Sequence, residues 1–249
     1  PPKPAGKASP LQPGAARPAR PAGRYAGITM VVVGLLILAY GTITLLWQDP
    51  WTAWQTARAQ DRAKVQYEKI VKDFRKSASI QTKQATRAWL HRQAALFNLN
   101  TPEGSPVGRL SIPKIDVHFT IVQGTEESTL TKGPAHYVET PLPGAKGKWT
   151  VGIAGHRTTY LAPFRRLNEL DPGDHITIQM PYARFSYIVE KTKIVDATDQ
   201  TVLAADSAIT GRKPYNRLAL TACHPPFSAA QRIIVYSRLL RYKIAKARS

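Results

Sequence analysis

The amino-acid sequence predicts a mainly β domain, an antiparallel barrel or sandwich of about 140 residues, that follows a transmembrane helix and a helical stalk. Two observations predict the helical part. Residues 25–47 form an uncharged apolar run, and residues 52–98 contain no glycine or proline. The third observation predicts the β domain: short apolar runs rich in β-branched residues recur at 108–115, 117–122, 148–154, 175–180, 184–197, 218–222 and 232–240.

Length and composition allow one such domain and exclude several classes of protein. With 249 residues, 43% of them hydrophobic and 20% charged, the chain is neither wholly disordered nor a many-pass membrane protein. A single cysteine rules out an internal disulfide, and a metal site would need at least two cysteines or several histidines placed together. We therefore expect no cofactor and no metal.

The formal net charge of +19 raises the question of nucleic-acid binding. The basic residues, however, gather before residue 25 and within 58–92, and no helix-turn-helix, RNA-binding or zinc-finger signature accompanies them. Basic charge in such places is typical of membrane orientation and of attraction to anionic lipid headgroups or wall polymers. We expect a membrane partner and no nucleic acid.

The first 47 residues predict a membrane anchor. Residues 1–24 are Pro, Ala, Gly and basic residues, and are expected to be a disordered tail. The 23 uncharged residues at 25–47 are long enough to span the roughly 30 Å hydrocarbon layer, which favours a transmembrane helix over a cleaved signal peptide or a buried core helix. Five basic residues precede the span and Asp49 follows it, so the N-terminus is expected in the cytoplasm and the remaining chain outside the cell.

Residues 48–98 are expected to form a helical stalk. Tyr67, Ile70, Val71 and Phe74 form an apolar stripe along it. This stripe could pack on the following domain or on a second copy of the chain. Turn residues predict a linker at 99–106, and the β domain occupies 107–249. The oligomeric state is left open.

Cys223 is the only thiol of the chain, and its surroundings predict a nucleophile. The strand that carries it is closed by Pro225 and Pro226, so the thiol is expected at a strand end, where it can face a cleft. The alternative is that a lone cysteine is a small buried hydrophobic residue.

A nucleophilic thiol needs a base, because a reference pKa near 8.5 leaves only a few per cent thiolate at neutral pH. Among the six histidines, His136 and His156 are the candidates, since His224 is expected to point away from Cys223 by strand alternation. His156 follows an apolar strand on a glycine turn, which favours it. Arg232 opens the next strand and could donate to an oxyanion, with a solvated strand-end residue as the alternative.

Several segments, taken in order, resemble the sortases, and among them the class E enzymes of actinobacteria. The resemblance covers residues 107–240 and is carried by GIAGHRTTY at 152–160 and LTACHPPFSAAQR at 220–232. Further landmarks are RLSIPKI, GPAHY and FRRLNELDPGD at 109–115, 133–137 and 164–174. The resemblance implies an eight-stranded sortase barrel in which Cys223 is the nucleophile, His156 the acid/base and Arg232 the oxyanion-stabilising or substrate-positioning residue.

One position departs from the family pattern. Sortases typically have Thr directly before the cysteine, whereas this chain has Ala222, so a hydroxyl thought to help hold the substrate and the oxyanion is missing. Thr221 is adjacent but points elsewhere by strand alternation, which makes it a doubtful substitute. Substrate contacts are assigned to Thr221 and Ala222, and to Tyr137 and Tyr160 as readers of the signal, although either tyrosine could instead pack in the barrel.

The resemblance implies a membrane-anchored cysteine transpeptidase that cleaves an LAxTG- or LPxTG-like sorting signal of secreted proteins between Thr and Gly. The acceptor would be a peptidoglycan cross-bridge or lipid II amine, or a pilin lysine in a pilin-polymerising enzyme. A thiol hydrolase and a weakly active or inactive adhesion or scaffold domain are the rivals. No Asp or Asn can be assigned to orient His156, so we expect no standing ion pair and a slow enzyme with a bell-shaped pH profile.

Overall fold

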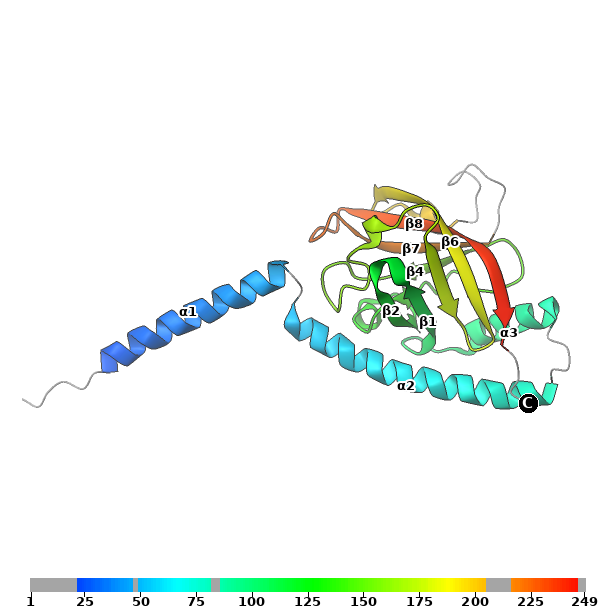
Figure 1. Ribbon diagram of the computed structural model, residues 1–249, viewed down its shortest axis with the longest axis horizontal. Coiled ribbons are helices and arrows are strands. Elements are labelled where there is room, and N and C mark those ends of the chain that lie inside the picture. Colours follow the sequence, from blue (N-terminus) through cyan, green and yellow to red (C-terminus); the bar gives the residue numbers. More distant parts are fainter. Residues whose placement is uncertain (1–21, 47–48, 82–85, 205–215, 246–249) are drawn as a thin grey trace, which may run out of the picture. The chain divides into compact units, whose positions relative to one another are not determined.

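The computed structural model describes residues 22–46, 49–81, 86–204 and 216–245 (Figure 1). Most of the expected basic tail, and Trp47 at the end of the expected span, lie outside these residues. The helices are α1 (Ala22–Leu46), α2 (Pro50–Gln81), α3 (Arg87–Asn100) and the short α4 (Glu127–Leu130). The strands are β1 (Pro106–Ile112), β2 (Val117–Gln123), β3 (Ala135–His136), β4 (Thr150–Ala154), β5 (His175–Gln179), β6 (Ala183–Asp196), β7 (Arg217–His224) and β8 (Gln231–Ile244).

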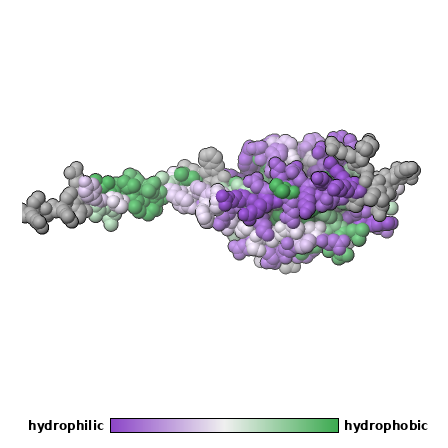
Figure 2. All heavy atoms as spheres, turned by 90° about the horizontal axis from the view of Figure 1, so that it is seen from below, coloured by the Kyte–Doolittle hydropathy of each residue, from purple (hydrophilic) through white to green (hydrophobic). Residues whose placement is uncertain are grey.

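Helix α1 is the apolar helix that the sequence predicts. Its segment Tyr25–Thr44 has a mean hydropathy of 2.2, and it is the one helix among the described residues that is long and apolar enough to cross a membrane. Figure 2 shows apolar side chains gathered along it. The chain divides into two compact units, residues 1–42 and 43–249, which are described separately.

The eight strands close into a barrel in the order β1-β2-β3-β4-β7-β8-β6-β5. Most neighbours are antiparallel, but β2 with β3 and β4 with β7 are parallel. The expectation of a purely antiparallel sheet is therefore wrong at these two pairs. Parallel neighbours need a crossover connection. A segment containing α4 joins β2 to β3, and a longer segment containing β5 and β6 separates β4 from β7.

Strand β7 is covered on both faces for most of its length. Its even-numbered residues pack in the main core of the barrel, and they are Leu218, Leu220 and Ala222. Ala219, on the opposite face, packs in a second cluster with Ile234 and Tyr236 of β8 and with Leu203. This alternation follows from the period of two in a strand. It places the last odd-numbered residue of β7, Cys223, on the outer face of the barrel.

Helix α2 packs along the barrel (Figure 1). The side chains of Thr56, Ala63 and Tyr67 are buried at the contact. The Tyr67 hydroxyl donates to the Gln179 carbonyl at the end of β5 (2.6 Å), and Phe74 packs against the main core. Of the two partners open to the apolar stripe, the following domain is the one that the structure shows.

One side chain of α2 completes the hydrogen bonding of β2. The Gln60 side-chain amide accepts from the Thr120 backbone N–H (2.7 Å) and donates to the Thr120 carbonyl (3.0 Å). It also donates to the Lys132 carbonyl (2.6 Å). Strand β2 pairs with β3 only at Val122 and Gln123, so Gln60 supplies at Thr120 the bonds that a neighbouring strand would make.

Candidate active site

Cys223 is the penultimate residue of β7 and is half-buried. The strand ends at His224, directly before Pro225, where the two prolines predict its end. Of its two neighbours in the barrel (Figure 1), β8 pairs with β7 as far as His224, and β4 pairs as far as Thr221. The thiol therefore lies on a rigid element and can be approached from two adjacent strands.

Arg232 lies directly opposite Cys223 in the antiparallel pairing of β7 with β8. Directly opposed side chains of antiparallel strands lie on the same face, with Cβ atoms roughly 5 Å apart. The guanidinium is oriented by the loop between the strands, because its Nη1 donates to the carbonyls of Ala229 (2.9 Å) and Gln231 (3.0 Å). A permanent cation is thus fixed beside the thiol.

His156 follows β4 on the other side of Cys223. Ala154 is in register with Thr221, and the Gly155 N–H donates to the Thr221 carbonyl (3.0 Å), which continues the parallel pairing. His156 lies two residues beyond Ala154, as Cys223 lies two residues beyond Thr221, so a continued parallel register would set the two residues level with each other. Cys223 and Arg232 lie on the neighbouring strands β7 and β8, and His156 follows β4, the other neighbour of β7.

The His156 imidazole is half-buried, and its Nε2 atom is buried without a hydrogen-bond partner among the described residues. Burial lowers the pKa of His156 below its ordinary value, while the negative charge of Glu127 partly raises it. The Tyr160 ring lies 4.8 Å from the imidazole, centroid to centroid. This nitrogen has no partner to hold its proton, but it is covered in this structure, so a substrate would reach it only after neighbouring groups move.

Thr221 and Tyr137 lie on the outer face with Cys223. Thr221 is two residues before Cys223 on the same strand, and its hydroxyl hydrogen-bonds with the Tyr137 hydroxyl (2.9 Å). Tyr137 is held on β4 by its N–H bond to the Gly152 carbonyl (3.1 Å), and its ring lies where a Cβ at Gly152 would clash. Burial raises the pKa of the Tyr137 hydroxyl, against the opposing effect of the Thr221 hydrogen bond and of Arg232.

Ala222 faces the opposite way. Its side chain is 3% exposed and belongs to the main core of the barrel. The structure therefore does not bring the Ala222 side chain together with Cys223, and a hydroxyl at this position would point into the barrel. The side-chain hydroxyl that shares a face with the thiol is the one on Thr221.

Tyr160 belongs to the loop that follows His156. Tyr160, Leu161 and Ala162 all have positive φ angles, of 54°, 62° and 41°, a conformation that non-glycine residues adopt at a cost in energy. The Tyr160 N–H donates to the Thr52 hydroxyl of α2 (3.4 Å). Tyr137 and Tyr160, the two tyrosines expected to read the signal, thus lie near the ends of β4 and β7. Tyr137 precedes His156 in the chain, and Tyr160 follows it.

Arg157 is a residue of the site that the sequence did not single out. Its side chain is 4% exposed, and its guanidinium donates to the Cys223 carbonyl (3.3 Å) and to the Asn168 side chain (2.7 Å). It also contacts the His224 Nδ1 atom (2.7 Å). Arg157 therefore ties the histidine loop to the end of β7. Its burial as a charged group depends on these several partners, which are distant in sequence.

The other candidate histidine is a structural residue. His136 is 1% exposed, and both ring nitrogens are occupied, one by the Gln123 side chain (3.0 Å) and the other by the Thr140 hydroxyl (3.1 Å). Burial lowers the pKa of His136 to about 4. It cannot serve Cys223. Among the described residues, no three His, Cys, Asp or Glu side chains are grouped so as to hold a metal ion.

Comparison with known proteins shows what the chain is similar to. A family model described as a sortase domain matches residues 110–240. Sortase D of Bacillus subtilis (strain 168) is 32% identical over 213 residues, which cover 84% of this chain and 94% of that protein. Sortase SrtE1 of Streptomyces coelicolor is 28% identical over 227 residues, 88% of this chain and 57% of that protein.

Solved structures give the same answer for the barrel. The crystal structure of sortase E1 from Streptomyces coelicolor, with a tripeptide in the active site, shares 30% sequence identity with a TM-score of 0.53. The match covers 57% of this chain and 91% of that chain. Sortase E from Streptomyces avermitilis matches at 26% identity with a TM-score of 0.52, over 57% of this chain and 93% of that chain. The predicted eight-stranded barrel is confirmed.

Proposed function

Because the chain belongs to the sortase family of transpeptidases, we propose that Cys223 is its nucleophile, His156 its general acid and base, and Arg232 its oxyanion-binding residue. The observation that supports the proposal is the register of three neighbouring strands: Arg232 of β8 lies opposite Cys223 of β7, and β4, paired with β7, ends two residues before His156. A thiol, a proton donor and a fixed cation on one face are the groups that acyl transfer to an amine requires.

In the first half-reaction the Cys223 thiolate attacks the carbonyl carbon of the Thr–Gly bond in a sorting signal. The Arg232 guanidinium donates to the oxyanion of the tetrahedral intermediate, and His156 protonates the leaving glycine amine as the C–N bond breaks. The products are a thioester on Cys223 and a released peptide. In the second half an acceptor amine attacks the thioester, His156 takes up its proton, and the thiolate leaves.

The donor is proposed to be an LAxTG- or LPxTG-like signal at the end of a secreted protein. The related sortase E1 was crystallised with a tripeptide in its active site, which supports a peptide donor. Tyr137 and Thr221 lie on the face of Cys223 and are hydrogen-bonded to each other, so we assign them to contacts with the signal. Tyr160, whose ring lies against that of His156, is assigned to the same contacts with the signal.

The acceptor is proposed to be an amine of the cell wall, in a peptidoglycan cross-bridge or in lipid II. Helix α1 would anchor the chain in the cell membrane with its N-terminus in the cytoplasm. The barrel would then lie outside the cell, where secreted donors and wall amines are both present. A pilin lysine is the alternative acceptor, since it presents the same primary amine.

The test uses the full chain in a nonionic detergent, mixed with a Leu-Ala-x-Thr-Gly peptide and triglycine. Mass spectrometry is expected to find the peptide cut after Thr and joined to triglycine, and a thioester on Cys223 when triglycine is left out. The Cys223→Ala variant should give neither species, while Ser228→Ala, in the neighbouring loop, should retain both. Cleavage that ignores added amine would indicate a hydrolase, and the absence of both product and thioester would contradict the proposal.

A further inference from the structure

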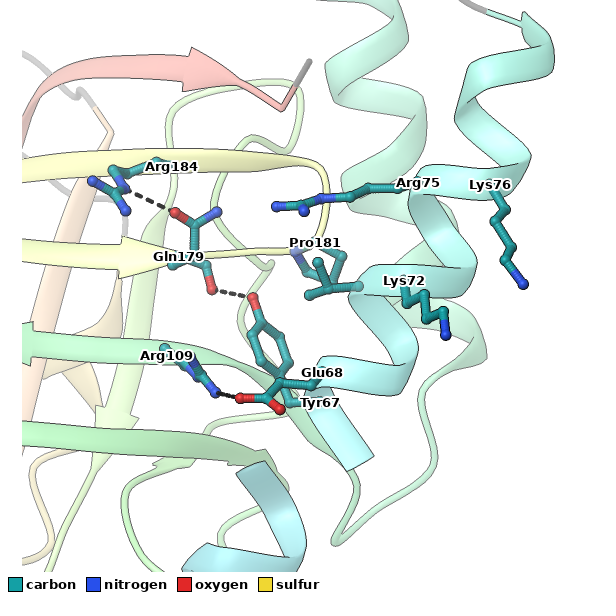
Figure 3. A pocket seen from close by; sticks show the side chains of 10 residues that line it. Tyr67, Glu68, Lys72, Arg75, Lys76, Arg109, Gln179, Pro181 and Arg184 are labelled. Atoms are coloured by element: carbon teal, nitrogen blue, oxygen red, sulfur yellow. Dashed lines mark hydrogen bonds and ion pairs between the residues drawn. The ribbon is translucent and has the colours of Figure 1, made fainter. Parts of the chain in front are cut away.

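A groove of about 590 Å³ lies between α2 and the strands β1, β5 and β6 (Figure 3). In the closed order of the barrel, β1 and β5 lie across from β4 and β7. The groove is therefore on the other side of the barrel from Cys223, and the reaction proposed above makes no use of it.

Three arginines from three elements line this groove. Figure 3 shows Arg75 of α2 reaching toward the strands, on which Arg109 and Arg184 lie, while Lys72 and Lys76 form the outer rim and extend away from the strands. Glu68 is the only acid among the described lining residues, and it forms an ion pair with Arg109 (2.7 Å). Five cations against one carboxylate leave the groove strongly positive.

Two of the three arginines, Arg109 and Arg184, are held by neighbouring side chains. The Arg184 Nε donates to the Gln179 side chain (2.8 Å), and the Arg109 guanidinium lies 5.5 Å from the centroid of the buried Tyr67 ring. The Tyr67 hydroxyl is itself occupied by the Gln179 carbonyl. Tyr67 is itself buried (2% exposed), so it supports Arg109 from below, and Arg109 and Arg184 present oriented guanidinium groups to the groove.

The groove continues along α2. A second groove, of about 380 Å³, shares Arg109 with the first and is lined by Gln60, Asp61 and Lys64 of the helix. Together the two follow α2 from residue 60 to residue 76, about 24 Å at the rise of an α-helix. On the strand side, Lys243 of β8 is in register with Arg184 and is exposed, so positive charge extends beyond the groove.

We propose that this groove binds a linear phosphodiester polymer. The planar fork of an arginine matches two oxygens of a phosphate, and charges repeated along an elongated groove match phosphates repeated along a chain. A flat bilayer would contact protruding residues such as Lys72 and Lys76, whereas the arginines that converge inside a concave groove favour a chain that can enter it.

Binding is tested with fluorescent poly(glycerol phosphate) and the full chain in a nonionic detergent, by fluorescence anisotropy at several salt concentrations. The double variant Arg75→Gln/Arg184→Gln should bind about tenfold more weakly or worse, with a shallower dependence on salt, because two charge-assisted contacts are lost. The matched control is Arg62→Gln/Lys69→Gln, which removes the same charge from exposed positions of α2 that line neither groove. It should bind within about twofold of the unmodified chain.

Thermal unfolding of each variant shows whether the fold is kept. If the double variant does not fold, the single variant Arg75→Gln, which retains the Arg184–Gln179 bond, takes its place. Equal affinity in the groove variants and the unmodified chain would overturn the proposal. The same holds if the polymer fails to bind while vesicles containing anionic phospholipid bind through Arg75 and Arg184, because the occupant would then be a membrane surface.

Discussion

In the proposed mechanism, the protonation of His156 sets the fraction of the enzyme that is ready to react. The proposed mechanism needs an imidazolium beside a thiolate, and burial lowers the pKa of His156 because the charged ring loses hydration. The charged form of His156 is therefore scarcer at neutral pH than in a free histidine. The acid limb of the rate profile should lie below the ordinary histidine pKa of about 6.5.

Removing the Glu127 charge should move that limb further. In Glu127→Gln the imidazolium loses an electrostatic partner, so the pKa of His156 falls, the acid limb of kcat/KM shifts to lower pH, and the plateau rate drops. The measurement is the pH dependence of peptide ligation. Glu126→Gln, which removes the same charge one residue away, is the control. An acid limb that stays in place in Glu127→Gln would contradict the assignment of His156.

Some of the residues at the site could be inferred from the sequence alone, and others could not. The order of Cys223, His156 and Arg232 along the chain points to three strand ends, and the structure brings those ends together. Residues two apart on a strand share a face. Strand alternation therefore sets the Thr221 hydroxyl on the same side as the Cys223 thiol, and the residue between them, 222, on the other side. The role of Arg157 depends on partners that are distant in sequence, so no local pattern reveals it.

At the scale of elements, α2 is a part of the folded domain. Three of its side chains donate hydrogen bonds to backbone carbonyls of the domain. Thr56 donates to Thr131, Gln60 to Thr120 and Lys132, and Tyr67 to Gln179. Buried backbone groups without partners are costly, and these bonds satisfy several of them. Experiments on the activity of this domain should therefore retain α2.

Gln60→Ala should destabilise the domain by about 2–3 kcal/mol, because it leaves the Thr120 N–H without its partner and removes two further bonds. Gln55→Ala, at an exposed position of the same helix, should stay within about 0.5 kcal/mol of the unmodified chain. Thermal or denaturant unfolding followed by circular dichroism measures both. Equal midpoints for the two variants would mean that the α2 contact adds little to stability.

The elements themselves divide into those that local patterns specify and those that they do not. Long apolar runs such as 184–197 and 218–222 correspond closely to β6 and β7. Strand β3 has two residues and no periodicity to detect, and the parallel pairs depend on which crossover the whole chain adopts. The sequence predicts the apolar stripe of α2 but not its partner, because the same periodicity results whether a barrel or a second chain covers the helix face.

At the scale of the whole molecule, the site exists only when the barrel is closed. Cys223 lies between strands that begin at Thr150 and Gln231, and β8 pairs in turn with β6. Cys223 and Arg232 meet within one antiparallel pair of consecutive strands, whereas the pairing of β4 with β7 joins parts of the chain that β5 and β6 separate. A fragment that lacks β8 would carry the cysteine without the arginine.

The single cysteine also reports the orientation of the molecule. If α1 anchors the chain with the barrel outside the cell, a membrane-impermeant maleimide should label intact cells that express the chain, and should not label the Cys223→Ala variant. Labelling of the detergent-solubilised chain shows that the half-buried thiol is reachable. Labelling that appears only after the cells are lysed would place the barrel in the cytoplasm and overturn the proposed orientation.

The bonds of Gln60 to Thr120 have a consequence for association between molecules. Away from its two-residue contact with β3, strand β2 would present an open edge, and an open strand edge is a template on which another chain can add a strand. The Gln60 side-chain amide hydrogen-bonds the N–H and the carbonyl of Thr120, which such a strand would otherwise use. By covering this edge, α2 opposes aggregation. A chain that lacks α2 is therefore expected to associate through β2 and to precipitate at concentrations where the complete chain stays in solution.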